Sequence, residues 1–267
     1  MSIGGRLLML NRTNSTSGGK PEGVRQTRGA ISDLSHSSRK RLMQLCGSID
    51  VESMGLPDFL TLTYPGEWPD EPERWKRDLR ALWRRFDRHF PGYVGIWRIE
   101  PQERGAPHFH VAVWNAPGLV DNAGKEWISR QWFEVVGSRD LKHLAAGTSV
   151  EPVQTWRKWI SYVSKYIAKV GKDGRKQVFD YEIGRYWGIR NKSRLKIKMQ
   201  MEKVSADKFV RIRRVLKKMI DANKKQRGQK VQKYNINMDV PGLWCYLNNE
   251  TVVKLLGLFE NDEPLPF

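Results

Sequence analysis

Residues 93–114, YVGIWRIEPQERGAPHFHVAVW, decide the fold of this chain. Two runs rich in aliphatic and aromatic residues, 93–100 and 108–114, flank the turn-forming segment 101–107. Apolar runs of this composition, bounded by proline and glycine, are typical of strands. The stretch therefore predicts two antiparallel strands joined by a turn.

The same stretch contains a candidate metal site. His108 and His110 are one residue apart, so in a strand both imidazoles point to the same face. In a hairpin, Glu100 lies opposite His108 with the Cβ atoms about 5 Å apart, and Arg98 lies opposite His110. Two imidazoles and one carboxylate suit Mg²⁺ or Mn²⁺, with Zn²⁺ as a third option. Arg98 is placed to pair with a phosphate or with Glu100. The alternative is a pair of half-buried structural histidines.

The rest of the chain alternates predicted strands with amphipathic helices. Further strands are expected at 59–64, at 148–153 and within 178–189, and helices at 35–45, at about 71–90, at 127–136 and at 155–170. This order predicts an α+β fold, with a central antiparallel sheet of about five strands flanked by helices. No run approaches the roughly 18 apolar residues of a membrane span. Two cysteines are too few for a disulfide framework, so a reducing cytoplasm is expected.

Positive charge is concentrated near the C-terminus. The chain carries a net charge of +18, and residues 190–233 hold 17 Lys and Arg against three acids. This density indicates a polyanion binder, and nucleic acid is the expected partner; a solvated helix face is the alternative. We predict a flexible arm at 1–33, a nuclease domain at 34–190 and a basic helical extension at 191–267. The predicted DNA-binding residues are Arg98, Arg190, Lys192, Arg194, Lys196, Lys198, Arg211, Arg213, Arg214, Lys217 and Lys218.

The helix predicted at 155–170 has a second polar stripe beside its apolar one. Advancing 100° per residue brings Tyr162, Tyr166, Lys165 and Lys169 together, apart from the apolar side chains. Tyrosines four residues apart are also common in amphipathic packing. A phenol with a pKa near 10 is a weak nucleophile at neutral pH, so catalysis would require neighbouring positive charge.

Three motifs together resemble the rolling-circle replication initiators of the HUH endonuclease superfamily. They are FLTLTYP at 59–65, GAPHFH at 105–110 and YVSKYIAK at 162–169. The paired tyrosines are similar to those of the two-tyrosine initiators of small single-stranded DNA phages and plasmids. The resemblance covers roughly residues 57–190 and implies an HUH endonuclease-like fold.

The resemblance also implies a reaction. A tyrosine attacks a phosphate of single-stranded or hairpin origin DNA, forming a 5′-phosphotyrosine and a free 3′-OH that primes rolling-circle replication. Strands are later rejoined. Tyr166 is expected to cut first and Tyr162 second, with Lys165 and Lys169 steadying the phenolate or phosphate. His108, His110 and Glu100 would hold the divalent ion.

Related functions remain as alternatives. An HUH transposase or relaxase shares this chemistry, and a non-catalytic nucleic-acid-binding protein would carry the same basic residues. The chain lacks a Gly-x-x-x-x-Gly-Lys-[Ser/Thr] phosphate loop, so a host helicase and a host polymerase are expected partners. The expected location is the cytoplasm of a bacterial host cell, without membrane association.

Overall fold

The chain divides into two compact units. In the computed structural model the described residues are 2–4, 7–11, 34–167, 179, 182–201, 205–226, 228–231 and 242–246. One unit is Arg25–Lys196, and the other combines Met1–Val24 with Ile197–Phe267. The boundary follows Lys196, six residues beyond the boundary expected from the sequence.

A five-stranded sheet forms the centre of the Arg25–Lys196 unit. Its strands lie in the order β6–β3–β5–β4–β7, and each neighbouring pair is antiparallel. The predicted α+β fold with about five strands is therefore confirmed. The bounds are β3 Asp58–Thr63, β4 Val94–Pro101, β5 Pro107–Trp114, β6 Thr148–Pro152 and β7 Trp187–Arg190.

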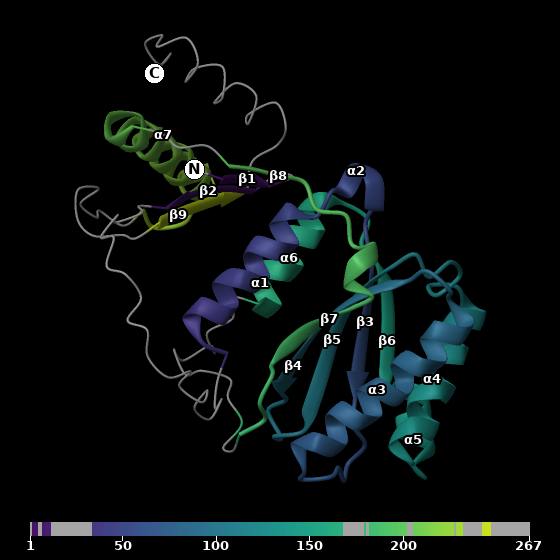
Figure 1. The fold of residues 1–267 in the computed structure, drawn as a ribbon. Helices are drawn as coiled ribbons and strands as arrows, with labels where there is room; N and C mark the ends of the chain where they lie inside the picture. The colour runs from purple at the N-terminus through teal and green to yellow at the C-terminus, as the bar shows by residue number, and fades with distance from the viewer. Residues whose placement is uncertain are drawn as a thin grey trace, which may run out of the picture. The chain divides into compact units, whose positions relative to one another are not determined.

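Helices cover both faces of this sheet (Figure 1). Because strand residues alternate between faces, Leu60 and Val111 pack in one hydrophobic cluster with α3 and α4, whereas Phe59 and Ala112 pack in another with α1 and α6. The three layers bury apolar side chains on both sides of the sheet. The helix bounds are α1 His36–Ser48, α2 Val51–Met54, α3 Pro72–His89, α4 Asn122–Val136, α5 Leu141–Ala146 and α6 Trp156–Ile167.

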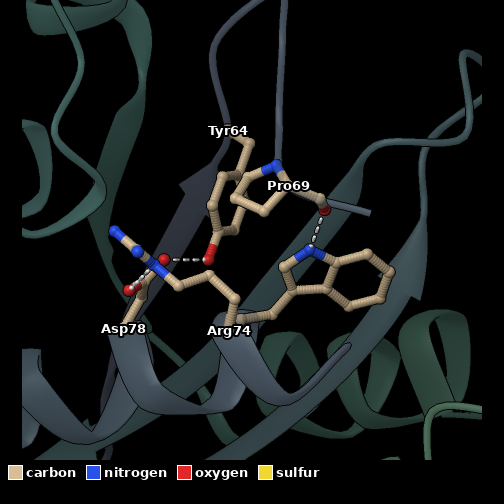
Figure 2. A network of polar contacts seen from close by, with 5 residues as sticks. Tyr64, Pro69, Arg74 and Asp78 are labelled. Atoms are coloured by element: carbon tan, nitrogen blue, oxygen red, sulfur yellow. Dashed lines mark hydrogen bonds and ion pairs between the residues drawn. The ribbon is translucent and has the colours of Figure 1, made fainter. Parts of the chain in front are cut away.

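Polar contacts fasten α3 to the end of β3 and the loop that follows it (Figure 2). The Tyr64 hydroxyl donates to Asp78 Oδ2 at 2.9 Å, and Arg74 Nε donates to Asp78 Oδ1 at 3.0 Å. Trp75 Nε1 donates to the Pro69 carbonyl at 2.5 Å. Asp78 is buried, and both carboxylate oxygens have donors, so the buried carboxylate is satisfied.

The second unit contains strands from both ends of the chain. Its sheet has the order β8–β1–β2–β9, with every neighbouring pair antiparallel. The flexible arm expected at 1–33 is therefore wrong for residues 2–4 and 7–11, and the extension is not purely helical. The bounds are β1 Ser2–Gly4, β2 Leu7–Asn11, β8 Met199–Met201, β9 Gly242–Tyr246 and the basic helix α7 Ala206–Gln226.

Helix α7 begins and packs as its sequence predicts. The Ser205 hydroxyl accepts from the Lys208 backbone N–H at 3.3 Å, which caps the helix. Ile212, Val215 and Leu216 are buried along one face. Within the described part of the chain, no helix combines the length and the apolar character that a membrane crossing requires.

The segment 178–189 forms less strand than its aromatic alternation predicts. Among its described residues, strand pairing begins at Trp187, where β7 runs along the edge of β4. Phe179, Ile183 and Tyr186 are buried in the cluster that contains α3, so their side chains pack in the core without strand pairing. Alternation thus reported burial correctly and strand pairing only in part.

Candidate functional site

The β4–β5 hairpin has the register that the sequence predicts. Glu100 pairs with His108 and Arg98 pairs with His110. All four side chains therefore project from the same face of the sheet, the face covered by α1 and α6. The roles predicted for these residues depend on what their side chains contact.

Glu100 is the centre of a buried polar cluster. His110 Nε2 lies 2.8 Å from Glu100 Oε1, and Arg98 Nη2 lies 3.3 Å from Glu100 Oε2. All three residues are only 6% exposed. Burial raises the pKa of Glu100, but the hydrogen bond with His110 and the charges of His110, Arg98 and His108 outweigh burial and leave it below its usual value. Glu100 is therefore ionised and accepts a hydrogen bond from His110.

His108 lies at the edge of this cluster and is held by Thr63. The two imidazole rings of His108 and His110 are 4.5 Å apart between centroids, and His108 is half-buried. Its Nδ1 is 3.1 Å from the Thr63 hydroxyl oxygen, across the β3–β5 pair. This contact orients the ring and leaves Nε2 on its far side from Thr63.

Thr63 is itself held by α4 and α5. Its carbonyl accepts from Trp132 Nε1 and from His143 Nε2, both at 2.7 Å. Its backbone N–H donates to the Gly147 carbonyl at 2.8 Å. Trp132 and His143 are buried, so these contacts hold the end of β3 rigidly beside His108.

Arg104 fastens the turn of the hairpin to the loop after β3. Its guanidinium donates to the carbonyls of Tyr64 at 2.6 Å, Pro65 at 2.7 Å and Gly66 at 3.2 Å. The same group lies 4.9 Å from the centre of the Trp68 ring. The hairpin end that carries His108 is therefore attached to β3 at two places, Thr63 and this loop.

The predicted metal donors fit a divalent ion by their chemistry. Adjacent ligands of an octahedral ion with bonds of about 2.1 Å lie roughly 3 Å apart, close to the 2.8 Å between His110 and Glu100. As they stand, however, no three His, Cys, Asp or Glu side chains of the described residues form a metal-binding group. His110 and Glu100 bond to each other, and His108 would complete the group.

Tyr162 lies over the same face of the sheet. Trp159 and Val163 are buried and anchor α6, while the half-buried Tyr162 ring packs 3.4 Å from the Phe59 ring, between centroids. A cavity of about 30 Å³, with room for about two water molecules, opens beside it. Its lining side chains are Leu42, Cys46, Phe59, Ile96, Trp97, Arg98, His110, Ala112, Trp159, Tyr162 and Val163.

The other residues of the tyrosine motif remain predictions. Lys165 and Tyr166 lie within α6, but their side chains are outside the described residues, as is all of Lys169. The structure therefore brings one of the two tyrosines, Tyr162, to the cavity that His110 and Arg98 also line.

The predicted DNA-binding residues fall into two groups. Arg190 forms an ion pair with Asp87 and so serves the fold; Lys217 is 2.8 Å from Asp221. Arg98 is buried, and Arg211 and Arg213 are half-buried. The predicted residues that are exposed, and that a large ligand can reach, are Lys192, Arg194, Lys196, Lys198, Arg214 and Lys218.

Sequence reasoning did not identify Thr63 or Arg104. The period of two in β3 places Thr63 on the same face as His108, but only once the β3–β5 register is known. Arg104 lies in a polar turn, where no local pattern predicts its three carbonyl partners.

Comparison with known proteins gives two matches to replication proteins. Residues 57–171, which run from β3 to beyond α6, match the family model of the replication-associated protein ORF2 and its phage counterparts. A replication-associated protein of Pseudomonas phage Pf3 is 28% identical over 254 residues, which are 90% of this chain and 84% of that protein. No solved structure gives a significant match. The sheet with its hairpin and tyrosine helix is thus similar to the replication-associated proteins of this family, which confirms the resemblance to phage replication initiators.

Proposed function

We propose that this protein initiates rolling-circle replication by nicking single-stranded origin DNA with a tyrosine. The observation that carries the proposal is the shared cavity: Tyr162, His110 and Arg98 line it together, although they come from three different elements. The similarity to the replication-associated protein of phage Pf3 supports a role in replication.

The proposed reaction is a phosphoryl transfer to tyrosine. The phenol oxygen forms a bond to the scissile phosphorus, the bond to the 3′ oxygen breaks, and that oxygen takes up a proton to become the 3′-OH. The 5′ end stays joined to the tyrosine, so a later attack by a 3′-OH rejoins strands without ATP. We assign the first cut to Tyr166 and the second to Tyr162, with Lys165 and Lys169 stabilising the phenolate or phosphate.

His108, His110 and Glu100 would hold the divalent ion, Mg²⁺ or Mn²⁺. When bound, such an ion polarises the phosphate and offsets the charge that develops on its oxygens. Arg98 holds the Glu100 carboxylate in place and contributes positive charge at the cavity. Thr63 and Arg104 keep the His108 end of the hairpin in register with β3.

The proposed partners follow from the reaction. The substrate is single-stranded or hairpin origin DNA, bound in part by the exposed cations of residues 192–198 and of α7. A host helicase would separate the strands and a host polymerase would extend the 3′-OH, inside the bacterial cell.

A covalent-adduct assay tests this function. The protein is incubated with Mn²⁺ and end-labelled single-stranded origin DNA, and products are separated on a denaturing gel. Wild type should form a protein–DNA adduct that EDTA prevents. The double variant Tyr162→Phe/Tyr166→Phe should form none, because no phenol remains to attack, whereas Tyr93→Phe, on the opposite face of the sheet, should react like wild type.

The outcome separates the alternatives. If wild type forms no adduct, or if the double variant still forms one, the tyrosine mechanism is wrong and a non-catalytic DNA-binding protein remains. Cleavage of a transposon end or a conjugative origin in preference to a phage or plasmid replication origin would favour the transposase or relaxase alternative.

A further inference from the structure

Helix α3 carries a stripe of arginines on its exposed side. Arg77, Arg80, Arg84 and Arg88 are all exposed. At 100° per residue they fall within about 80° of one another around the helix, so they form one straight row. With a rise of 1.5 Å per residue, the row is about 16 Å long.

No structural partner among the described residues explains these four arginines. Two other arginines of α3 pair with acids: Arg74 with Asp78 at 3.0 Å, and Arg85 with Glu134 at 2.5 Å. The side chains of Arg77, Arg80, Arg84 and Arg88 form no ion pair or hydrogen bond with a described residue. Like charges three or four residues apart also destabilise a helix. The stripe therefore does not serve the stability of α3.

Neighbouring cations extend the positive region. Arg185 is exposed, and half-buried Lys76 donates to the Ile183 carbonyl. Burial and then the charges of Arg185 and Arg80 lower the pKa of Lys76 to about 8, against the attraction of Glu73. Positive charge thus accumulates on this side of α3 without full compensation.

The stripe is separate from the candidate active site. Helix α3 packs against the face of the sheet that carries Leu60 and Val111, whereas Tyr162 and His110 lie on the opposite face (Figure 1). Ligands bound at the stripe and at the cavity would therefore lie on different sides of the sheet.

We propose that Arg77, Arg80, Arg84 and Arg88 bind the phosphate backbone of duplex DNA. Duplex DNA carries one negative charge per roughly 1.7 Å of its axis, so a row about 16 Å long faces enough phosphates for all four guanidinium groups. Single-strand binders place exposed aromatic rings beside their cations, but Trp75, Trp83 and Phe86 of α3 are buried. The surface thus lacks a stacking platform from these rings and suits a backbone held by charge alone.

This inference rests on the proposed function only for DNA as the polyanion. The duplex that it binds would be the double-stranded DNA next to the single-stranded cleavage site. Binding at the stripe would hold the protein near the origin while the opposite face acts on the separated strand.

Fluorescence anisotropy with the full chain tests the proposal. A short labelled duplex and an unstructured single strand of oligothymidine are each titrated over a series of salt concentrations. The variant Arg77→Gln/Arg80→Gln/Arg84→Gln/Arg88→Gln should bind the duplex roughly tenfold or more weakly, and the slope of log K against log salt should fall by about 3 to 4, since each lost phosphate contact removes about 0.9. Affinity for the single strand should change less than about twofold.

A matched variant controls for net charge. Lys125→Gln/Arg130→Gln/Arg139→Gln/Lys142→Gln removes four exposed cations from α4, α5 and the loop between them, and should bind the duplex almost as wild type does. The melting temperature of the α3 variant should equal or exceed that of wild type, because like-charge pairs are removed.

Three outcomes would overturn the proposal. They are unchanged duplex affinity in the α3 variant, an equal loss in the matched variant, or an equal loss of single-strand binding. None of these measurements depends on cleavage, so a protein that fails to form a tyrosine adduct can still pass this test, and the reverse also holds.

Discussion

A single hydroxyl connects the candidate metal site to the far layer of the fold. Thr63 contacts His108 through its side chain, and its carbonyl accepts from Trp132 and His143 on α4 and α5. A histidine that binds a metal through one ring nitrogen needs a partner on the other nitrogen to set its orientation and tautomer. Thr63 is placed to be that partner for His108.

Replacing Thr63 by valine tests this role at the scale of one residue. Thr63→Val keeps the shape but removes the hydroxyl, so the affinity for Mn²⁺ should fall by about 10- to 100-fold. Thr63→Ser should retain most of the affinity. Calorimetric Mn²⁺ titration without DNA measures both, and thermal unfolding confirms that the variants are folded. A folded Thr63→Val protein that binds Mn²⁺ as tightly as wild type would show that the hydroxyl does not orient His108.

At the scale of the element, α3 combines a core face with a charged face. Trp75, Leu82 and Phe86 are buried on one side, and exposed arginines occupy the other. Between the two faces, half-buried Lys76 donates to the Ile183 carbonyl. Helix α3 thus attaches the segment before β7 to the core through a lysine whose charge is disfavoured.

The lowered pKa of Lys76 predicts a pH dependence of stability. Burial and the charges of Arg185 and Arg80 bring the pKa to about 8, whereas an unfolded lysine has a pKa of about 10.4. Between these values the unfolded state binds more protons, so the free energy of unfolding should rise with pH. This contribution is fully present above about pH 10.4 and is lost as the pH falls through 8.

Urea unfolding of matched variants measures this effect. The stability of wild type minus that of Lys76→Met should increase from about pH 8 to pH 10.4. The same difference for Lys142→Met, at an exposed position, should stay flat. A flat difference for Lys76→Met as well would mean that Lys76 titrates normally in the folded protein.

At the scale of the whole molecule, the two units differ in how they are built. Both hydrophobic clusters of the five-stranded sheet consist of residues between Leu34 and Leu195. The second unit joins strands from the two ends of the chain, β1 and β2 with β8 and β9. The first unit therefore has a complete core without the second.

A fragment of residues 25–196 should consequently fold by itself. We expect a single cooperative unfolding transition in urea, followed by tryptophan fluorescence, because every residue of the two clusters is retained. The fragment should bind DNA more weakly than the full chain because it lacks α7. Absence of a cooperative transition would mean that the terminal strands are needed for the core.

The sequence by itself determined the features that depend on neighbouring residues. The hairpin with Glu100 opposite His108, the α6 helix with Tyr162 and the capped basic helix α7 follow from periodicity, turn residues and capping, which act over a few positions. The tertiary structure alone decided which distant segments meet. The pairing of residues 2–11 with the C-terminal strands, the carbonyl partners of Thr63 and the cavity shared by Tyr162 and Arg98 all join positions far apart in the chain. Such contacts depend on how the whole chain packs, and no local pattern encodes their partners.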